Sequence, residues 1–166
     1  MVDFEEARKA FAEKYECGGK RISNKRDVLW AVERAYIDTM PRTVEGHGEV
    51  PKDRLASLRN ELADTFCTYF DENPPTTLEA FEEAHRTLCT EHFLTPYNKL
   101  LSEFGVAEQQ YGKAQKIVNM TFKYIACLDD ANEHKGHFDF CHMPIDGFIL
   151  EWCREHCDIS GTVSWS

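Results

Sequence analysis

Apolar residues recur at three- and four-residue spacing along most of the chain, the spacing of one face of an α-helix. In residues 3–16 this pattern is formed by Phe4, Ala7, Phe11 and Tyr15, and Cys17-Gly18-Gly19 ends the helix. Similar patterns predict four more helices. The first is capped by Asn24 and ends before Pro41, the second begins at Asp53, and the third is capped by Thr77. The fourth is a short helix from Tyr97 to Phe104, which Pro96 separates from the one before it.

The segment around 108–128 differs, because apolar residues cover nearly its whole circumference. Such a helix is usually the buried centre of a bundle. Residues 129–143 are polar and irregular, and a final helix is predicted after Pro144. Since β-branched residues never alternate over a useful length, we expect an all-α fold in which residues 1–166 form one domain of six or seven helices.

Composition limits the classes of partner. The chain has 166 residues, 42% of them hydrophobic, and a formal net charge of −10. No apolar run approaches the roughly 18 residues of a membrane span, and the N-terminus lacks the regions of a secretion signal, so we expect a cytoplasmic protein with no membrane contact. The acidic balance argues against broad nucleic-acid binding but leaves room for a local basic site.

A local basic site is indicated by residues 109–128, which contain no Asp or Glu, where about three or four acids would be expected. The same stretch holds Lys113, Lys116 and Lys123. On a helix these three lie within roughly 80° of one another. Two interpretations stay open: the lysines extend out of the core to meet acidic neighbours, or they form an anion site with an activated amine.

A second signal is His142-Met143-Pro144-Ile145-Asp146 at the start of the last predicted helix. Asp146 is either an ordinary early helical residue favoured by the helix dipole or a carboxylate at the edge of a pocket.

These two stretches, Tyr111 to Met120 and His142 to Leu150, together resemble the catalytic region of helix-hairpin-helix DNA glycosylases. They are most similar to the 8-oxoguanine glycosylases, in particular the archaeal branch. The resemblance implies a glycosylase-like core, Lys116 as nucleophile with Lys113 as the alternative, and Asp146 as the essential aspartate. The Gly-X-Gly hairpin of that family is not evident, since only Gly105 and Gly112 lie nearby.

The resemblance implies recognition or excision of a modified purine, without a required cofactor. The enzyme would flip the target nucleotide into a pocket, and the lysine amine would attack the sugar C1′. The amine must be neutral to attack, and burial beside Ile117 and Phe122 is expected to lower its pKa. Asp146 would stabilise the cationic sugar. Lys113, Lys123 and His142 are the expected substrate-binding residues.

Cysteine and histidine residues concentrate near the C-terminus. His137, Cys141, Cys153 and Cys157 include two pairs at four-residue spacing and could form a structural zinc site. The alternative is that the thiols are buried as small apolar groups and the imidazoles are solvated. His47, His85 and His92 are expected to be ordinary surface or half-buried residues.

A second function class stays open beside the enzyme. A protein this acidic could instead be a non-enzymatic binding or inhibitor protein that captures a nucleotide or engages a protein partner, with or without zinc as a stabiliser.

Overall fold

The computed structural model describes residues 4–41 and 43–142, with side chains described from residue 9 onward, and this part of the chain is helical without any strand. The all-α prediction is confirmed there. Its six α-helices are α1 (Phe4–Tyr15), α2 (Lys25–Thr39), α3 (Lys52–Asp71), α4 (Leu78–Cys89), α5 (Thr95–Glu103) and α6 (Tyr111–Ile125). The helix predicted after Pro144 lies outside the described residues.

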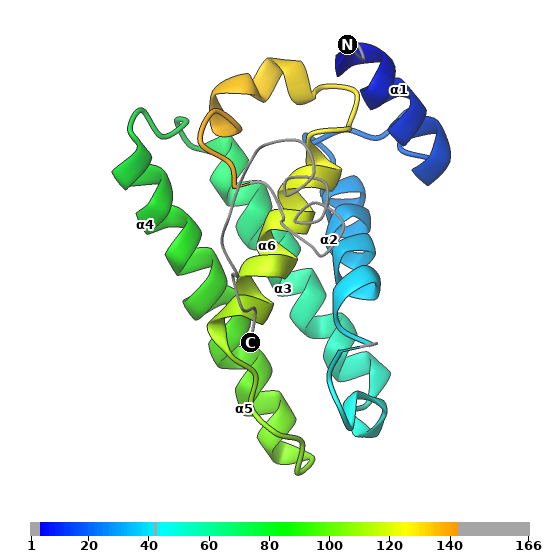
Figure 1. The fold of residues 1–166 in the computed structure, drawn as a ribbon, viewed down its shortest axis with the longest axis vertical. Helices are drawn as coiled ribbons and strands as arrows, with labels where there is room; N and C mark the ends of the chain where they lie inside the picture. The colour runs from blue at the N-terminus through cyan, green and yellow to red at the C-terminus, as the bar shows by residue number, and fades with distance from the viewer. Residues whose placement is uncertain (1–3, 42, 143–166) are drawn as a thin grey trace, which may run out of the picture.

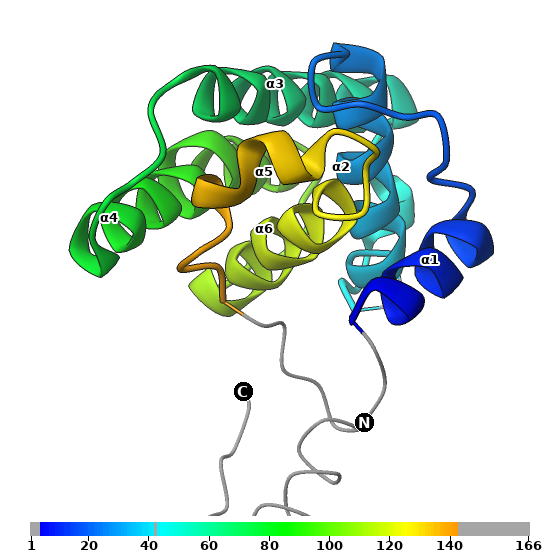
Figure 2. The same cartoon turned by 90° about the horizontal axis from the view of Figure 1, so that it is seen from above.

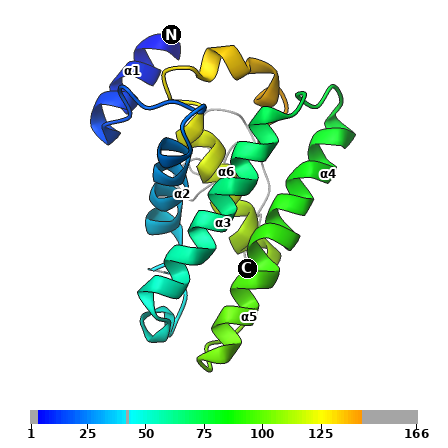
Figure 3. The same ribbon diagram turned by 180° about the vertical axis from the view of Figure 1, so that it is seen from behind.

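Helix α6 lies at the centre of the arrangement. It runs between α2 and α4, and α3 lies behind it in Figure 1 and in front of it in Figure 3. Viewed from above in Figure 2, α3 and α6 form successive layers, and α1 stands beyond α2 at one side. Within the described residues, one side of α6 therefore faces away from the other helices.

The core between these helices is largely aromatic. The Phe122 ring on α6 lies 5.1 Å from the ring of Phe66 and 5.4 Å from that of Tyr69, both on α3. On α4, the Phe81 ring lies 6.0 Å from Phe122. Because Phe66, Phe81 and Phe122 are at most 2% exposed, they join α3, α4 and α6 in one hydrophobic core.

Two predicted helix caps are confirmed. The Asn24 side chain accepts a hydrogen bond from Arg26 N at 3.1 Å, and Thr77 Oγ1 accepts one from Ala80 N at 3.2 Å. Each satisfies an N–H group that has no partner within its own helix. The third predicted start differs slightly, because α3 begins at Lys52 and Asp53 lies within its first turn.

The predicted break at Pro96 is wrong. A π-helical segment, Thr90–Leu94, joins α4 to α5 without a loop, and Pro96 occupies the first turn of α5. Proline cannot donate the backbone hydrogen bond of a regular helix. The wider π-turn changes the bonding pattern immediately before Pro96, with Thr95 N donating to Thr90 O, so the helical path continues.

A buried carboxylate fixes the path of the chain after α6. Asp130 is 2% exposed and accepts hydrogen bonds from Ile22 N at 2.7 Å and Ser23 N at 3.3 Å. Burial by itself would raise the pKa of Asp130, but these N–H groups outweigh it and hold the pKa below its usual value. The 3₁₀ segment Ala131–His137 starts from this anchor and leads towards His142.

Candidate functional site

The three predicted lysines lie on α6, on the side of the helix opposite its core-facing residues. Lys116 and Lys123 are exposed, and Lys113 is half-buried. The expected burial of Lys116 is therefore wrong. At 100° per residue, the fully buried Ala114 and Val118 point almost directly away from Lys116, so this helix is not enclosed on all sides. The exposed amine does not receive the desolvation predicted from its apolar sequence neighbours.

Among the side chains that the structure describes, in residues 9–41 and 43–142, no carboxylate forms an ion pair with Lys113, Lys116 or Lys123. Lys113 Nζ lies 3.4 Å from the carbonyl oxygen of Thr43, and Lys123 Nζ lies 5.1 Å from the centre of the Phe11 ring. The expectation that acidic neighbours neutralise these lysines is not met by the described contacts. We call Lys113, Lys116 and Lys123 the lysine face.

The start of α6 is held rigidly against α5. Asn98 Nδ2 donates to Gln109 O at 2.9 Å, and Gln109 N donates to Asn98 Oδ1 at 2.8 Å. Gly105, with φ of +69°, makes the turn that ends α5. The first turn of α6 contains no acidic residue, and Gln110 gives it no side-chain cap. The positive end of the helix dipole therefore lies beside Lys113.

His142 lies where α4 meets α6. Its ring centre is 4.8 Å from that of His85 and 5.4 Å from that of Phe81. His85 Nε2 donates a hydrogen bond of 2.7 Å to Oδ1 of Asn119, which lies one helical turn after Lys116. The described chain thus ends against α4, beside a histidine that is hydrogen-bonded to the helix carrying the lysine face, and Asp146 lies outside the described residues.

Sequence reasoning missed the roles of His85 and Asn119. His85 is 2% exposed and Asn119 is 8% exposed. The available signal was Asn119 itself, an amide within an otherwise apolar segment, because a buried amide requires a partner. Burial lowers the pKa of His85, so its ring is neutral near pH 7.

Cys89 completes a buried Cys–His–Asn set of the residue types used in nucleophilic catalysis. Its Sγ is 3.8 Å from His85 Nδ1 and 3.9 Å from His85 Nε2. Since the sulfur is nearly equidistant from both nitrogens, it is aligned with neither lone pair. Burial raises the pKa of the Cys89 thiol to about 12, and its side chain is 0% exposed. These contacts are those of a buried polar cluster, and the thiol is expected to be unreactive in the folded protein.

Two of the four predicted zinc ligands lie in the described part of the chain. His137 Nε2 donates to Glu72 O at 3.1 Å, and its buried Nδ1 has no partner within that part. Cys141 Sγ donates to His137 O at 3.6 Å, and burial raises the pKa of this thiol to about 12. No group of three or more metal-binding side chains gathers in residues 4–41 and 43–142. Because Cys153 and Cys157 lie outside these residues, the zinc site stays a prediction.

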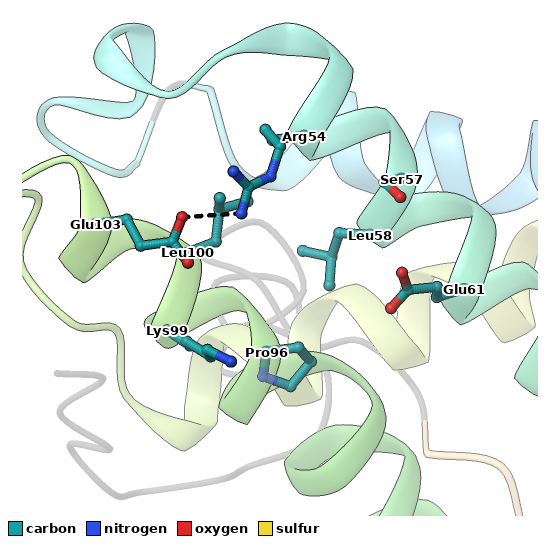
Figure 4. A pocket seen from close by; sticks show the side chains of 8 residues that line it. All are labelled: Arg54, Ser57, Leu58, Glu61, Pro96, Lys99, Leu100 and Glu103. Carbon is teal, nitrogen blue, oxygen red and sulfur yellow. Dashed lines mark hydrogen bonds and ion pairs between the residues drawn. The ribbon is translucent and has the colours of Figure 1, made fainter.

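A shallow groove of about 260 Å³ separates α3 from α5, away from every predicted site residue (Figure 4). Leu58 and Leu100 form its floor. An ion pair of 2.8 Å between Arg54 and Glu103 closes one end, and Glu61 lies towards the other end. Charges of both signs line a wide opening, which is typical of a solvated surface between two helices.

Comparisons with known proteins add no assignment to this geometry. No protein-family model, curated protein or solved structure matches the chain. None of the helices in the described residues combines the length and apolar content needed to cross a membrane.

Proposed function

We propose that this protein is a DNA glycosylase-like enzyme that recognises or excises a modified purine, with Lys116 as nucleophile and Asp146 as the essential aspartate. The observation that carries this proposal is the lysine face. Its three amines lie on one side of α6, Lys116 is exposed, and none of the three is paired with a carboxylate among the side chains described in residues 9–41 and 43–142. In a chain of net charge −10, an unneutralised cationic surface favours an anionic ligand there.

The packing of His142 supports the approach of Asp146 to this surface. His142 precedes Asp146 by four residues and contacts His85, which is hydrogen-bonded to Asn119 on α6. The chain leading to the Pro-X-Asp sequence therefore leaves from α4, one hydrogen-bonded contact away from the lysine-bearing helix.

Because Lys116 is exposed, the substrate itself must remove water from around its amine. A free, solvated amine is accessible to the sugar C1′ but is not desolvated in advance. A nucleotide that covers Lys116 would expel water from around the amine, and the loss of water disfavours its charged form. The neutral amine then attacks C1′ as the bond to the base breaks, and Asp146 stabilises the positive charge on the sugar. The departing base takes the bonding electrons and the proton that the amine loses, and cleavage of the C1′–O4′ bond opens the sugar ring to give the Schiff base.

Borohydride trapping tests this chemistry. The full chain is incubated with oligonucleotides that carry oxidised, alkylated, abasic or normal bases, and a reduced Schiff base is sought by mass spectrometry. We expect a covalent adduct with the original chain. The adduct should be absent with Lys116→Ala, and it should also be absent when borohydride is left out of the reaction. Lys99→Ala on α5 is the matched control, because Lys99 is also exposed but lies on the α3–α5 groove.

Two results would count against the proposal. An adduct that persists in Lys116→Ala but disappears in Lys113→Ala would move the nucleophile to Lys113. The absence of any adduct with a folded protein would exclude Schiff-base chemistry on the substrates tested.

A second candidate function is an acidic binding protein with a basic partner. It is favoured by exposed carboxylates where α3 ends and α4 begins, at Asp71, Glu72, Glu79 and Glu82. The double variant Glu79→Gln, Glu82→Gln would weaken the binding of a basic partner, whereas Lys116→Ala would leave that binding unchanged. The two variants therefore separate the two functions.

A further inference from the structure

We propose that the lysine face, extended by Phe11 and Tyr15 of α1, binds an unpaired nucleic-acid strand in preference to a duplex. This inference rests on the proposed function for the location of the site and specifies the form of its substrate. It is carried by the length of the face and by the aromatic rings and the carboxylates near one end of it.

The lysine face is short. Lys113 and Lys123 are ten residues apart on α6, which corresponds to about 15 Å of helix axis. A duplex carries about nine phosphate charges over that length, because its two strands together place one charge per roughly 1.7 Å. One stacked strand carries only about half that number, and three lysines offset most of its charge. The face therefore matches one strand better than two.

Aromatic rings continue the face beyond Lys123. The Phe11 and Tyr15 rings are partly exposed, with centres 4.4 Å apart, and Lys123 Nζ lies 5.1 Å from the Phe11 ring centre. Lys14 Nζ lies 5.4 Å from the centre of the Tyr15 ring. Cations beside aromatic rings are the elements that bind single strands, because an unpaired base can stack on a ring. Bases inside a duplex are already stacked and do not offer this contact.

Two exposed carboxylates lie near the Lys123 end of the lysine face. Tyr124, which follows Lys123, donates its hydroxyl to the exposed Asp38 of α2. Asp129 is exposed just beyond the end of α6. These charges, with the net charge of −10, repel the higher phosphate density of a duplex more strongly than that of one strand.

Fluorescence anisotropy on the full chain tests the preference. The probes are a labelled single-stranded DNA of about 15 nucleotides, an RNA of the same sequence and the matching DNA duplex, each titrated at several salt concentrations. We expect both single strands to bind at least about tenfold more tightly than the duplex. The plot of log K against log salt should have a slope of about −2 for three lysines, reduced by about 0.7 in Lys123→Ala.

Two further variants make the test specific. Phe11→Leu keeps an apolar side chain but removes the ring face, and it should weaken single-strand binding by about fivefold or more while leaving duplex binding unchanged. Lys99→Ala, on another face of the protein, should alter neither the affinity nor the slope.

The outcomes separate this inference from the proposed function. Equal or tighter duplex binding overturns the strand preference, and borohydride trapping on that duplex would leave the glycosylase proposal standing. Single-strand binding with the expected salt slope, but without a trapped adduct, supports the binding face and counts against the enzyme. If none of the three probes binds, or if the slope is the same in Lys123→Ala, the lysine face is not a nucleic-acid site.

Discussion

His85 on α4 donates a hydrogen bond from Nε2 to Oδ1 of Asn119 on α6, across 2.7 Å. The two residues are separated by 34 positions in the chain, and both side chains are buried. This bond fixes the orientation of the imidazole against which His142 packs. It therefore joins the packing of the bundle to the loop that leads to the Pro-X-Asp sequence.

The His85–Asn119 bond should show strong energetic coupling. We expect His85→Leu and Asn119→Leu each to lower the free energy of unfolding by about 1–3 kcal/mol, because each single change leaves the other buried polar group without its partner. The double variant should lose less free energy of unfolding than the two single variants lose together, since it leaves no unsatisfied polar group. Urea denaturation of all four proteins measures the coupling, and additive costs would show that the two side chains do not act as a pair.

Acid should destabilise the fold through His85. Burial lowers the pKa of His85 from its ordinary 6.5, so the unfolded state binds a proton more readily than the folded state. This part of the stability is present above pH 6.5 and is lost as the pH falls below it towards the folded-state pKa. Unfolding measured from about pH 7.5 to 5 should show a shallower acid loss in His85→Leu than in the original chain. An unchanged slope would assign the acid loss to other groups.

The N-cap of α4 should contribute measurable stability. Thr77→Ala removes the hydrogen bond to Ala80 N and should cost about 1 kcal/mol, which lowers the Tm by about 2–4 °C. The neighbouring Thr76→Ala is the matched control, since Thr76 precedes the cap and is also exposed. Calorimetry compares the two, and similar Tm values would contradict a capping role for Thr77.

Cys89 should be unreactive while the protein is folded. Its pKa of about 12 leaves almost no thiolate near neutral pH, and its side chain is 0% exposed. Iodoacetamide labelling followed by peptide mass spectrometry should modify the partly exposed Cys67 before Cys89. Labelling of Cys89 should appear only with denaturant. Rapid modification in the folded state would instead identify an activated thiol and reopen nucleophilic catalysis at this position.

Local sequence was sufficient to predict most of the helices. The spacing of apolar residues located the segments, and the caps at Asn24 and Thr77 marked two helix starts, because these interactions join residues only a few positions apart. Pro96 was misread for the same reason. A proline disfavours a regular helix locally, but the π-turn before it accommodates the missing donor, and residue type alone does not encode that choice.

The sequence also determined that Lys113, Lys116 and Lys123 share one side of a helix, because helical periodicity fixes their relative angles. Only the tertiary structure decided that this side is exposed. Apolar residues surround Lys116 in sequence, but α2, α3 and α4 cover only the opposite part of α6. The pairing of His85 with Asn119 was likewise decided by the packing of α4 on α6, since contacts between distant segments depend on how whole helices meet.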